Sequence, residues 1–252
     1  MTSKAFRKVK KGINNLPNLL YGYNLHVNRN KLRLIDRTFR DFCPEASSFA
    51  DLGGVWNVNA AYTVHTLKRY KIERAVLVDT DYPQILKERL GRFPQLTMLE
   101  GDFGTADAVR TVGSVDVIYF FDVLLHQANP DWDEVLDAYA RNSSCIVIYN
   151  QQFIYGSDAV RLTELPLENY IELTSDFRRD FYKYVYDHKY ELHPRYQKPW
   201  GDIHNIIQWG ITDSALRSTM TSLGFKEMYF HSFGRFIDIP ALEDHAFVFR
   251  KG

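Results

Sequence analysis

The stretch VDVIYFFDVLLH, residues 115–126, is continuously apolar from Val117 to Phe121 and then turns polar. Apolar side chains at consecutive positions indicate a strand that is buried on both faces. The run ends at Asp122, and His126 follows four residues later. We therefore expect both polar side chains just beyond the carboxyl end of a buried strand.

Comparable strands are predicted on either side of this one, in SFADLGG (48–54), RAVLVDTD (74–81), LTMLEGDFG (96–104) and CIVIYNQQF (145–153). The segments between them, such as DYPQILKERLGRF and PDWDEVLDAYARN, have the apolar spacing of helices. Apolar strands that alternate with helices predict an α/β fold whose parallel sheet is covered on both faces.

The end of the chain has a different order of elements. ITDSALRSTMTSLGF (211–225) predicts a helix that Thr212 or Asp213 caps and Gly224 ends. Two strands follow, KEMYFHSF (226–233) and HAFVFRKG (245–252). Residues 154–210 are rich in aromatic and charged side chains without a clear period, which indicates an insertion before the last helix.

The charge is balanced overall but not along the chain. The first 40 residues hold ten Lys or Arg and one acid, Asp36. This excess fits a solvated helical face that meets the acidic remainder, or else an anion-binding arm. No nucleic-acid motif accompanies it, and no apolar run of about 18 residues predicts a membrane span. Cys43 and Cys145 form no disulfide framework, so we expect a cytoplasmic protein.

Ligands of open parallel sheets bind beyond the carboxyl ends of the strands. The first strand is followed by Gly53 and Gly54, which permit a sharp turn and a close approach to a ligand. The dinucleotide pattern GxGxxG is not met, because Val55 and Asn57 replace glycines. A phosphate cradle is therefore not expected.

The next two strands end on acids. Asp79 can accept hydrogen bonds from both hydroxyls of a ribose. Asp102 and Phe103 suit an adenine, since the carboxylate can accept from the exocyclic amine while the ring covers a face. Each acid could instead be a helix cap, and Phe103 a core residue.

In these stretches the chain resembles the class I S-adenosylmethionine-dependent methyltransferases. ADLGG, AVLVDTD, EGDF and VDVIYFFDVLLH look like successive motifs of that family, over residues 48–153 and more weakly 211–250. The resemblance implies S-adenosylmethionine as cofactor and a Rossmann-like, doubly wound, mostly parallel seven-stranded sheet with an antiparallel last strand. It also implies donor-binding residues, which are Asp51, Gly53 and Gly54 near the methionine portion, Asp79 at the ribose, Asp102 and Phe103 at the adenine, and Asp122 at the methionine end.

The resemblance also suggests how the chain is organised. We expect residues 1–252 to form a single methyltransferase domain. Its parts are a basic helical N-terminal extension (1–45), a donor-binding half (46–153), an acceptor-side insertion or lid (154–210), and a closing helix with two strands (211–252).

The acceptor residues are predicted from the polar side chains that remain. His126 or His204 could act as a base, or could only line the pocket or form structural bonds. Polar and aromatic residues suited to a small polar acceptor are Asn150, Gln151, Gln152, Trp200 and Trp209. Turn chemistry or a packed lid would explain the same residues. The histidines lack a metal-ligand spacing, so no metal is expected.

These observations favour an O-methyltransferase acting on a small sugar-like or aromatic hydroxyl acceptor. An N-methyltransferase, and a non-catalytic nucleotide-binding or scaffold protein of the same fold, remain alternatives. An aminopropyl transferase would need a dense acidic pocket for a polyamine, and the sequence does not indicate one.

Overall fold

The computed structural model of the 252-residue chain describes residues 27–173, 179–195, 197–204, 206–235 and 239–252. Two compact units divide the chain after Tyr119. Most of the predicted N-terminal extension lies outside the described residues, but its end is helical. Helix α2 (Arg29–Arg37) continues into a π-helical turn, Thr38–Phe42.

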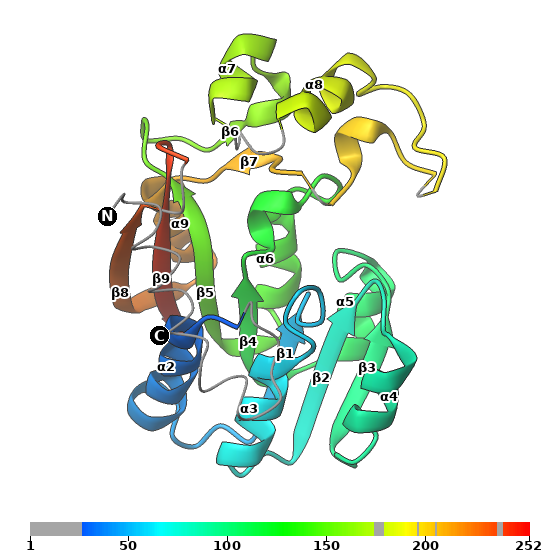
Figure 1. Cartoon of the computed structure of the whole chain (residues 1–252). Helices are drawn as coiled ribbons and strands as arrows, with labels where there is room; N and C mark the ends of the chain where they lie inside the picture. The colour runs from blue at the N-terminus through cyan, green and yellow to red at the C-terminus, as the bar shows by residue number, and fades with distance from the viewer. Residues whose placement is uncertain (1–26, 174–178, 196, 205, 236–238) are drawn as a thin grey trace, which may run out of the picture. The chain divides into compact units, whose positions relative to one another are not determined.

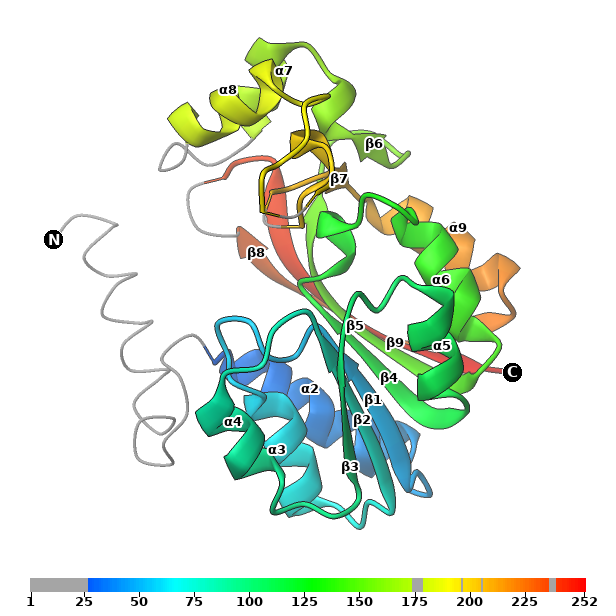
Figure 2. The same cartoon turned by 90° about the vertical axis from the view of Figure 1, so that its right-hand side faces the viewer.

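Unit 1 alternates strands and helices, as the apolar runs predicted (Figure 1). Its elements are β1 (Ser48–Leu52), α3 (Ala61–Arg69), β2 (Arg74–Asp79), α4 (Gln84–Leu90), β3 (Leu96–Glu100) and α5 (Ala106–Val112). Strands β1, β2 and β3 are parallel neighbours. Helices α3 and α4 cover one face of these strands and α5 the other (Figure 2). The near-complete burial of β1 and β2 follows from this double cover.

Strand β4 (Val115–Phe121) crosses the division between the units, and a 3₁₀ turn, Leu124–His126, follows it. Unit 2 continues with α6 (Trp132–Ala140) and β5 (Ser143–Phe153). The insertion contains β6 (Val160–Arg161), a 3₁₀ turn (Leu162–Glu164), α7 (Leu167–Leu173), α8 (Arg179–Asp187), a second 3₁₀ turn (Trp200–Asp202) and β7 (Trp209–Gly210). The chain closes with α9 (Asp213–Ser222), β8 (Phe225–Arg235) and β9 (Leu242–Lys251).

The main sheet has the strand order β3-β2-β1-β4-β5-β9-β8. Strand β9 is antiparallel to both of its neighbours, β5 and β8. The predicted seven-stranded sheet with an antiparallel last strand is therefore confirmed. The predicted capping of α9 is also confirmed, because the Thr212 hydroxyl accepts from the amide of Ala215 at 3.1 Å.

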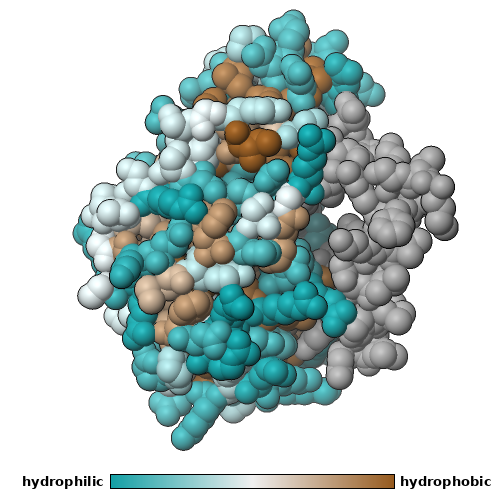
Figure 3. Space-filling model, turned by 90° about the vertical axis from the view of Figure 1, so that its left-hand side faces the viewer, coloured by the Kyte–Doolittle hydropathy of each residue, from teal (hydrophilic) through white to brown (hydrophobic). Residues whose placement is uncertain are grey.

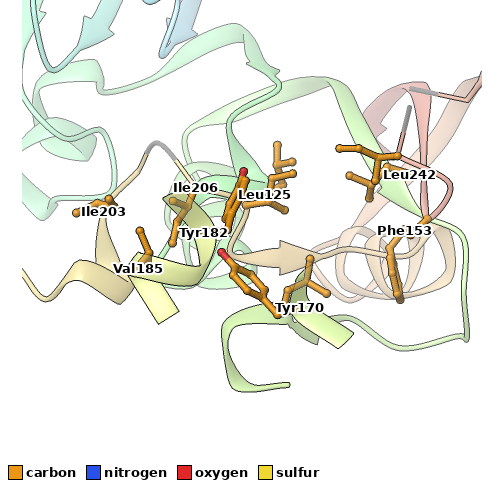
Figure 4. Close-up of a cluster of buried hydrophobic side chains, with 12 residues drawn as sticks. Leu125, Phe153, Tyr170, Tyr182, Val185, Ile203, Ile206 and Leu242 are labelled. Carbon is orange, nitrogen blue, oxygen red and sulfur yellow. The ribbon is translucent and has the colours of Figure 1, made fainter. Parts of the chain in front are cut away.

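The insertion packs in an apolar cluster that also includes Leu125 of the 3₁₀ turn after β4, the end of β5 and the start of β9. Tyr170, Tyr182 and Ile206 from the insertion contact this cluster, to which Leu125 and Phe153 also belong (Figure 4). The insertion is thus held by burial of side chains that the sequence presents without a regular period.

The face drawn in Figure 3 is mainly hydrophilic, with small apolar patches between polar side chains.

Candidate functional site

In unit 1 the loop after β1 is fastened to the end of β2 by the carboxylate of Asp79. Oδ2 of Asp79 accepts from the amides of Val55 at 2.7 Å and Trp56 at 3.2 Å. Its Oδ1 accepts from the amide of Thr80 at 2.7 Å. Asp79 is 6% exposed, and its pKa is raised because burial outweighs these bonds. Asp79, the residue predicted to bind the ribose, therefore holds the glycine loop in place.

The loop bends through residues in the left-handed backbone region. Gly53 has φ 76°, which glycine adopts without cost. Asn57 has φ 59°, and asparagine is among the few other residues that tolerate this conformation. Asn57 therefore supports a left-handed turn at a position where glycine is otherwise the most suitable residue.

Asp51 lies beneath this loop and is fully buried. Its Oδ2 accepts from the hydroxyl of Thr63 at 2.6 Å, whereas its Oδ1 has no hydrogen-bond partner within the described ranges. Burial raises the pKa of Asp51 to about 6, with a smaller contribution from the charge of Asp79, although the Thr63 bond opposes the rise. A Cβ at Gly54 would stand 2.5 Å from Cγ of Asp51. Gly54 is thus needed to make room for the buried carboxylate.

The predicted adenine residues follow β3. The carboxylate of Asp102 accepts from the amide of Gly104 at 2.9 Å, which closes a turn before α5. Phe103 is 8% exposed. Backbone bonds from Gly53 to Val78 and from Gly101 to Asp79 tie the three strand ends together. The predicted donor residues of unit 1 therefore share one edge of the sheet.

Asp122 belongs to unit 2 and stands at the end of β4 with φ 57°. Its amide donates to the carbonyl of Tyr149 at 2.7 Å. Its Oδ1 accepts from Nε2 of Gln151 at 2.5 Å, and the same nitrogen lies 3.3 Å from Oδ1 of Asp244 on β9. One amide thus links two carboxylates across three strand ends. Sequence reasoning missed Asp244, because only pairing of β5 with β9 brings it opposite Gln151.

The side chains of Asn150, Gln151 and Gln152 do not all point to the same side, because strand β5 extends through them to Phe153. Side chains alternate along a strand, so Gln151 faces away from Asn150 and Gln152. Nδ2 of Asn150 lies 3.3 Å from Oε1 of Gln152, and both side chains are buried. The remaining Oδ1 of Asn150 and Nε2 of Gln152 have no partner among the residues described. The three amide side chains that were predicted to suit a polar acceptor are therefore divided between the two faces of the sheet.

His126 ends the 3₁₀ turn after β4 and is bonded to the insertion. Its Nδ1 lies 2.6 Å from the carbonyl oxygen of Ile206. A carbonyl only accepts, so Nδ1 carries the proton, and in the neutral ring Nε2 bears the lone pair. The amide of Gln208 also donates to the carbonyl of Leu125 at 2.9 Å. The ring is thereby held in the tautomer that a base acting through Nε2 requires.

The other predicted acceptor residues lie in the insertion. Nε2 of His204 lies 3.3 Å from the ammonium of Lys198, which can only donate. Trp200 stacks obliquely on His193, with 4.2 Å between ring centroids. The guanidinium of Arg161 lies 5.7 Å from the ring centroid of Trp209, across the β6–β7 pair. Nε2 of His204 therefore accepts a hydrogen bond from a cation, whereas Nδ1 of His126 donates a hydrogen bond to a carbonyl.

Two observations concern metals and membranes. Within the ranges that the structure describes, no group of three His, Cys, Asp or Glu side chains is placed to hold a metal ion. None of the described helices combines the length and hydropathy needed to cross a bilayer.

Proteins similar to this chain are found by comparing its structure with solved structures, and not by comparing its sequence. No model of a protein family matches this sequence, and no curated protein sequence matches it. The N-terminal domain of EvdMO1, crystallised with S-adenosylhomocysteine and D-fucose, aligns with a TM-score of 0.57 at 14% identity, over 89% of this chain and 84% of that one.

Two proteins of Burkholderia thailandensis are also similar. The 1,6-didemethyltoxoflavin-N1-methyltransferase, with 1,6-didemethyltoxoflavin and S-adenosylhomocysteine bound, aligns with a TM-score of 0.55 at 11% identity, over 100% of this chain and 91% of that one. An O-methyltransferase family protein aligns with a TM-score of 0.52 at 12% identity, over 89% of this chain and 57% of that one. Together with the strand order, these alignments establish that the chain has the fold of the class I S-adenosylmethionine-dependent methyltransferases.

Proposed function

We propose that the chain is an S-adenosylmethionine-dependent methyltransferase that methylates an oxygen of a small polar acceptor, either sugar-like or an aromatic hydroxyl. The observation that carries the proposal is the acidic strand edge of unit 1, where Asp51 and Asp79 hold the glycine loop and Asp102 follows the neighbouring strand β3. Carboxylates and backbone groups suit a nucleoside that has hydroxyls and amines but no phosphate. The S-adenosylhomocysteine in the EvdMO1 and toxoflavin enzyme structures supports this donor.

The residues of unit 1 fit such a donor with one adjustment. A carboxylate has about four lone-pair positions, and backbone amides occupy three of those of Asp79. The longest of these bonds, 3.2 Å, comes from Trp56, whose side chain is 66% exposed. Ribose hydroxyls can replace this bond if the loop shifts at Trp56. The unpartnered Oδ1 of Asp51 is a further acceptor beneath the loop.

His126 is the base in this proposal. When bound, S-adenosylmethionine supplies an activated methyl group, so the protein needs only to align the acceptor and take its proton. Nε2 of His126 can accept that proton, because Nδ1 is committed to the carbonyl of Ile206. The bonds to Ile206 and from Gln208 hold the turn against the insertion. Trp200, Trp209 and Gln151 are proposed to contact the acceptor.

Fluorescence titration with S-adenosylhomocysteine tests the donor. Trp56 is largely exposed, so movement of the loop should change its emission. We expect a saturable change in the wild-type protein and its loss in Trp56→Phe, with binding retained by calorimetry. Absence of binding by calorimetry would refute the donor proposal, and binding without a Trp56 signal would refute the loop adjustment.

Transfer of a labelled methyl group tests the reaction. Hydroxyl and amine acceptors should be compared in parallel, and label on oxygen is the expected result. Label on nitrogen only would favour an N-methyltransferase. The EvdMO1 domain was crystallised in the presence of D-fucose, which supports including sugars among the acceptors. Donor binding without transfer to any acceptor would favour the non-catalytic alternative.

Substitution of the two histidines then tests the base. A positioned base contributes about 10² to 10⁴ in rate, so His126→Ala should lower kcat by that order and leave donor affinity unchanged. His204→Ala should have a small effect, because Nε2 of His204 lies beside Lys198. A larger loss in His204→Ala would move the base into the insertion.

A further inference from the structure

The side-chain amide of Gln151 is held in one orientation by two carboxylates. Its Nε2 lies 2.5 Å from Oδ1 of Asp122 and 3.3 Å from Oδ1 of Asp244. Ionised carboxylates only accept hydrogen bonds, so the nitrogen of the amide faces both acids and donates to them. A rotated amide would place its oxygen against two acceptors. The oxygen, Oε1, therefore points away from the two acids.

Strand pairing fixes the position of this amide as well as its orientation. Gln151 of β5 is the direct partner of Asp244 in the antiparallel pair with β9, and Asp122 stands at the end of the neighbouring strand β4. The backbone amide of Asp122 donates to the carbonyl of Tyr149 at 2.7 Å, which joins the ends of β4 and β5. Side chains on paired strands are placed more precisely than side chains on loops.

Oε1 of Gln151 is left to accept a hydrogen bond from a ligand. None of the residues that the structure describes donates to this oxygen. Gln151 is 5% exposed, so the residue is largely buried but not completely enclosed. An acceptor that stays unpaired in such surroundings costs free energy. A ligand group that donates a hydrogen bond is therefore favoured at this position, and a group that only accepts is not.

An aromatic pair lies on the same face of the sheet. Tyr149 precedes Gln151 by two residues, so both side chains point to the same side of β5. The ring of Tyr149 stacks on that of Phe233 of β8 with 5.5 Å between centroids, and Phe233 is 36% exposed. The face that carries the amide thus also offers apolar surface to the carbon skeleton of a ligand.

Asp122 connects this oxygen with the reaction proposed above. The resemblance to the methyltransferases puts Asp122 at the methionine end of the donor, and Gln151 is bonded to Asp122 directly. His126, the proposed base, ends the 3₁₀ turn that follows the same strand. A ligand group bound to Oε1 of Gln151 would therefore belong to the methyl acceptor.

We propose that Gln151 selects acceptors with a second hydroxyl beside the one that is methylated, so that the acceptor is a vicinal diol. The inference rests on the proposed methyl transfer and narrows its acceptor class. The second hydroxyl donates to Oε1 of Gln151, while Asp122 and Asp244 prevent the amide from turning. The methylated hydroxyl gives its proton to His126. A lone hydroxyl would leave Oε1 of Gln151 unpaired and would be used less well.

Labelled methyl transfer by the wild-type chain to matched acceptors tests this selection. Catechol and phenol differ by one hydroxyl, as do cis-1,2-cyclohexanediol and cyclohexanol. We expect kcat/KM for at least one diol to be about tenfold higher than for its mono-ol. The acceptor 2-methoxyphenol, whose neighbouring group only accepts, should resemble phenol. Equal transfer within both pairs, or transfer to none of these compounds, would overturn the inference.

A variant then tests whether Gln151 causes the preference. Gln151→Met keeps the length of the side chain but removes the amide, so the ratio of kcat/KM between diol and mono-ol should fall to about one. Gln84→Met, at an exposed glutamine of α4, is the matched control and should keep the wild-type ratio. A ratio that survives in folded Gln151→Met would overturn the role of Gln151.

Two further measurements keep the outcomes distinct. Thermal unfolding shows whether Gln151→Met is folded, and if it is not, the comparison of acceptors on the wild type still decides. Calorimetry with S-adenosylhomocysteine separates the two proposals. Absence of binding to the wild type would refute the donor proposal, whereas binding without a preference for diols would refute only the present inference.

Discussion

At the scale of single residues, Gly54 and Asp51 show how the absence of a side chain shapes the candidate donor site. The carboxylate of Asp51 occupies the space that a Cβ at Gly54 would need. Asp51 in turn is held by Thr63, and Asp79 fastens the next two residues of the loop. The glycine is therefore required by a buried acid of the protein itself.

Gly54→Ala should destabilise the fold, because the new Cβ would displace a buried carboxylate. Overpacking of this kind costs about 1 to 3 kcal/mol. Urea unfolding measures the loss, and Gly101→Ala is the matched control because a Cβ there meets nothing within 4 Å. Equal stability of the two variants would show that Asp51 can move aside.

Asp79→Asn should weaken S-adenosylhomocysteine binding and also loosen the glycine loop. The amide keeps the size of the side chain but loses the charge that strengthens its hydrogen bonds. Bonds to charged groups contribute about 1.5 to 3 kcal/mol, so we expect a loss of affinity of that order by calorimetry. Unchanged affinity in the folded variant would remove Asp79 from the donor site.

At the scale of elements, α9 is joined to the β8–β9 pair by a buried histidine. Nδ1 of His245 lies 2.8 Å from Asp213 and its Nε2 lies 3.2 Å from Glu243. Arg217 of α9 pairs with Asp213 of the same helix and with Glu227 of β8. Burial alone would lower the pKa of His245, but the bonds and charges of Asp213 and then Glu243 outweigh it, so this pKa is raised.

The stabilisation from His245 should therefore depend on pH. A raised pKa in the folded state means that the contribution is fully present below the unfolded value of about 6.5 and is lost as pH rises through the folded pKa. The free energy of unfolding of the wild type minus that of His245→Gln, expected at about 1 to 3 kcal/mol in acid, should shrink in base. Asp213→Asn should reduce the same difference. A difference that grows with pH would contradict this assignment.

The insertion depends on its apolar cluster in a comparable way. Ile206 is fully buried there, and its carbonyl accepts from His126. Ile206→Ala should cost about 2 to 5 kcal/mol in urea unfolding, as for other buried large-to-small changes. Ile154→Ala, at a position 40% exposed, is the control and should cost much less. Similar costs would indicate that the cluster contributes little.

At the scale of the whole molecule, the order of the seven strands determines which strand ends could bind the methyl donor. Ligand binding to the folded state alone stabilises by about 2.7 kcal/mol at a hundredfold excess over Kd. For a chain of this length about 1 kcal/mol shifts Tm by 2 to 4 °C, so S-adenosylhomocysteine should raise Tm by roughly 5 to 10 °C. ATP should not, because the loop lacks a phosphate pattern. A larger shift with ATP would contradict the donor proposal.

The sequence by itself determined the order and type of the main elements. Apolar runs such as Val117–Phe121 have few alternatives to a buried strand, and Thr212 and Gly224 delimit α9 by local backbone chemistry. These signals depend on neighbours in the chain, so they can be recognised without the fold. The acids that follow each strand were predicted at the sheet edge for the same reason.

Only the tertiary structure decided what those polar side chains contact. Asp79 bonds to a loop more than twenty residues away, and Gln151 meets Asp244 only because β9 pairs with β5. Arg161 and Asp202 form an ion pair within an insertion that has no regular period. Such contacts depend on packing between distant segments, whereas periodicity reports only which face of its own element a residue occupies.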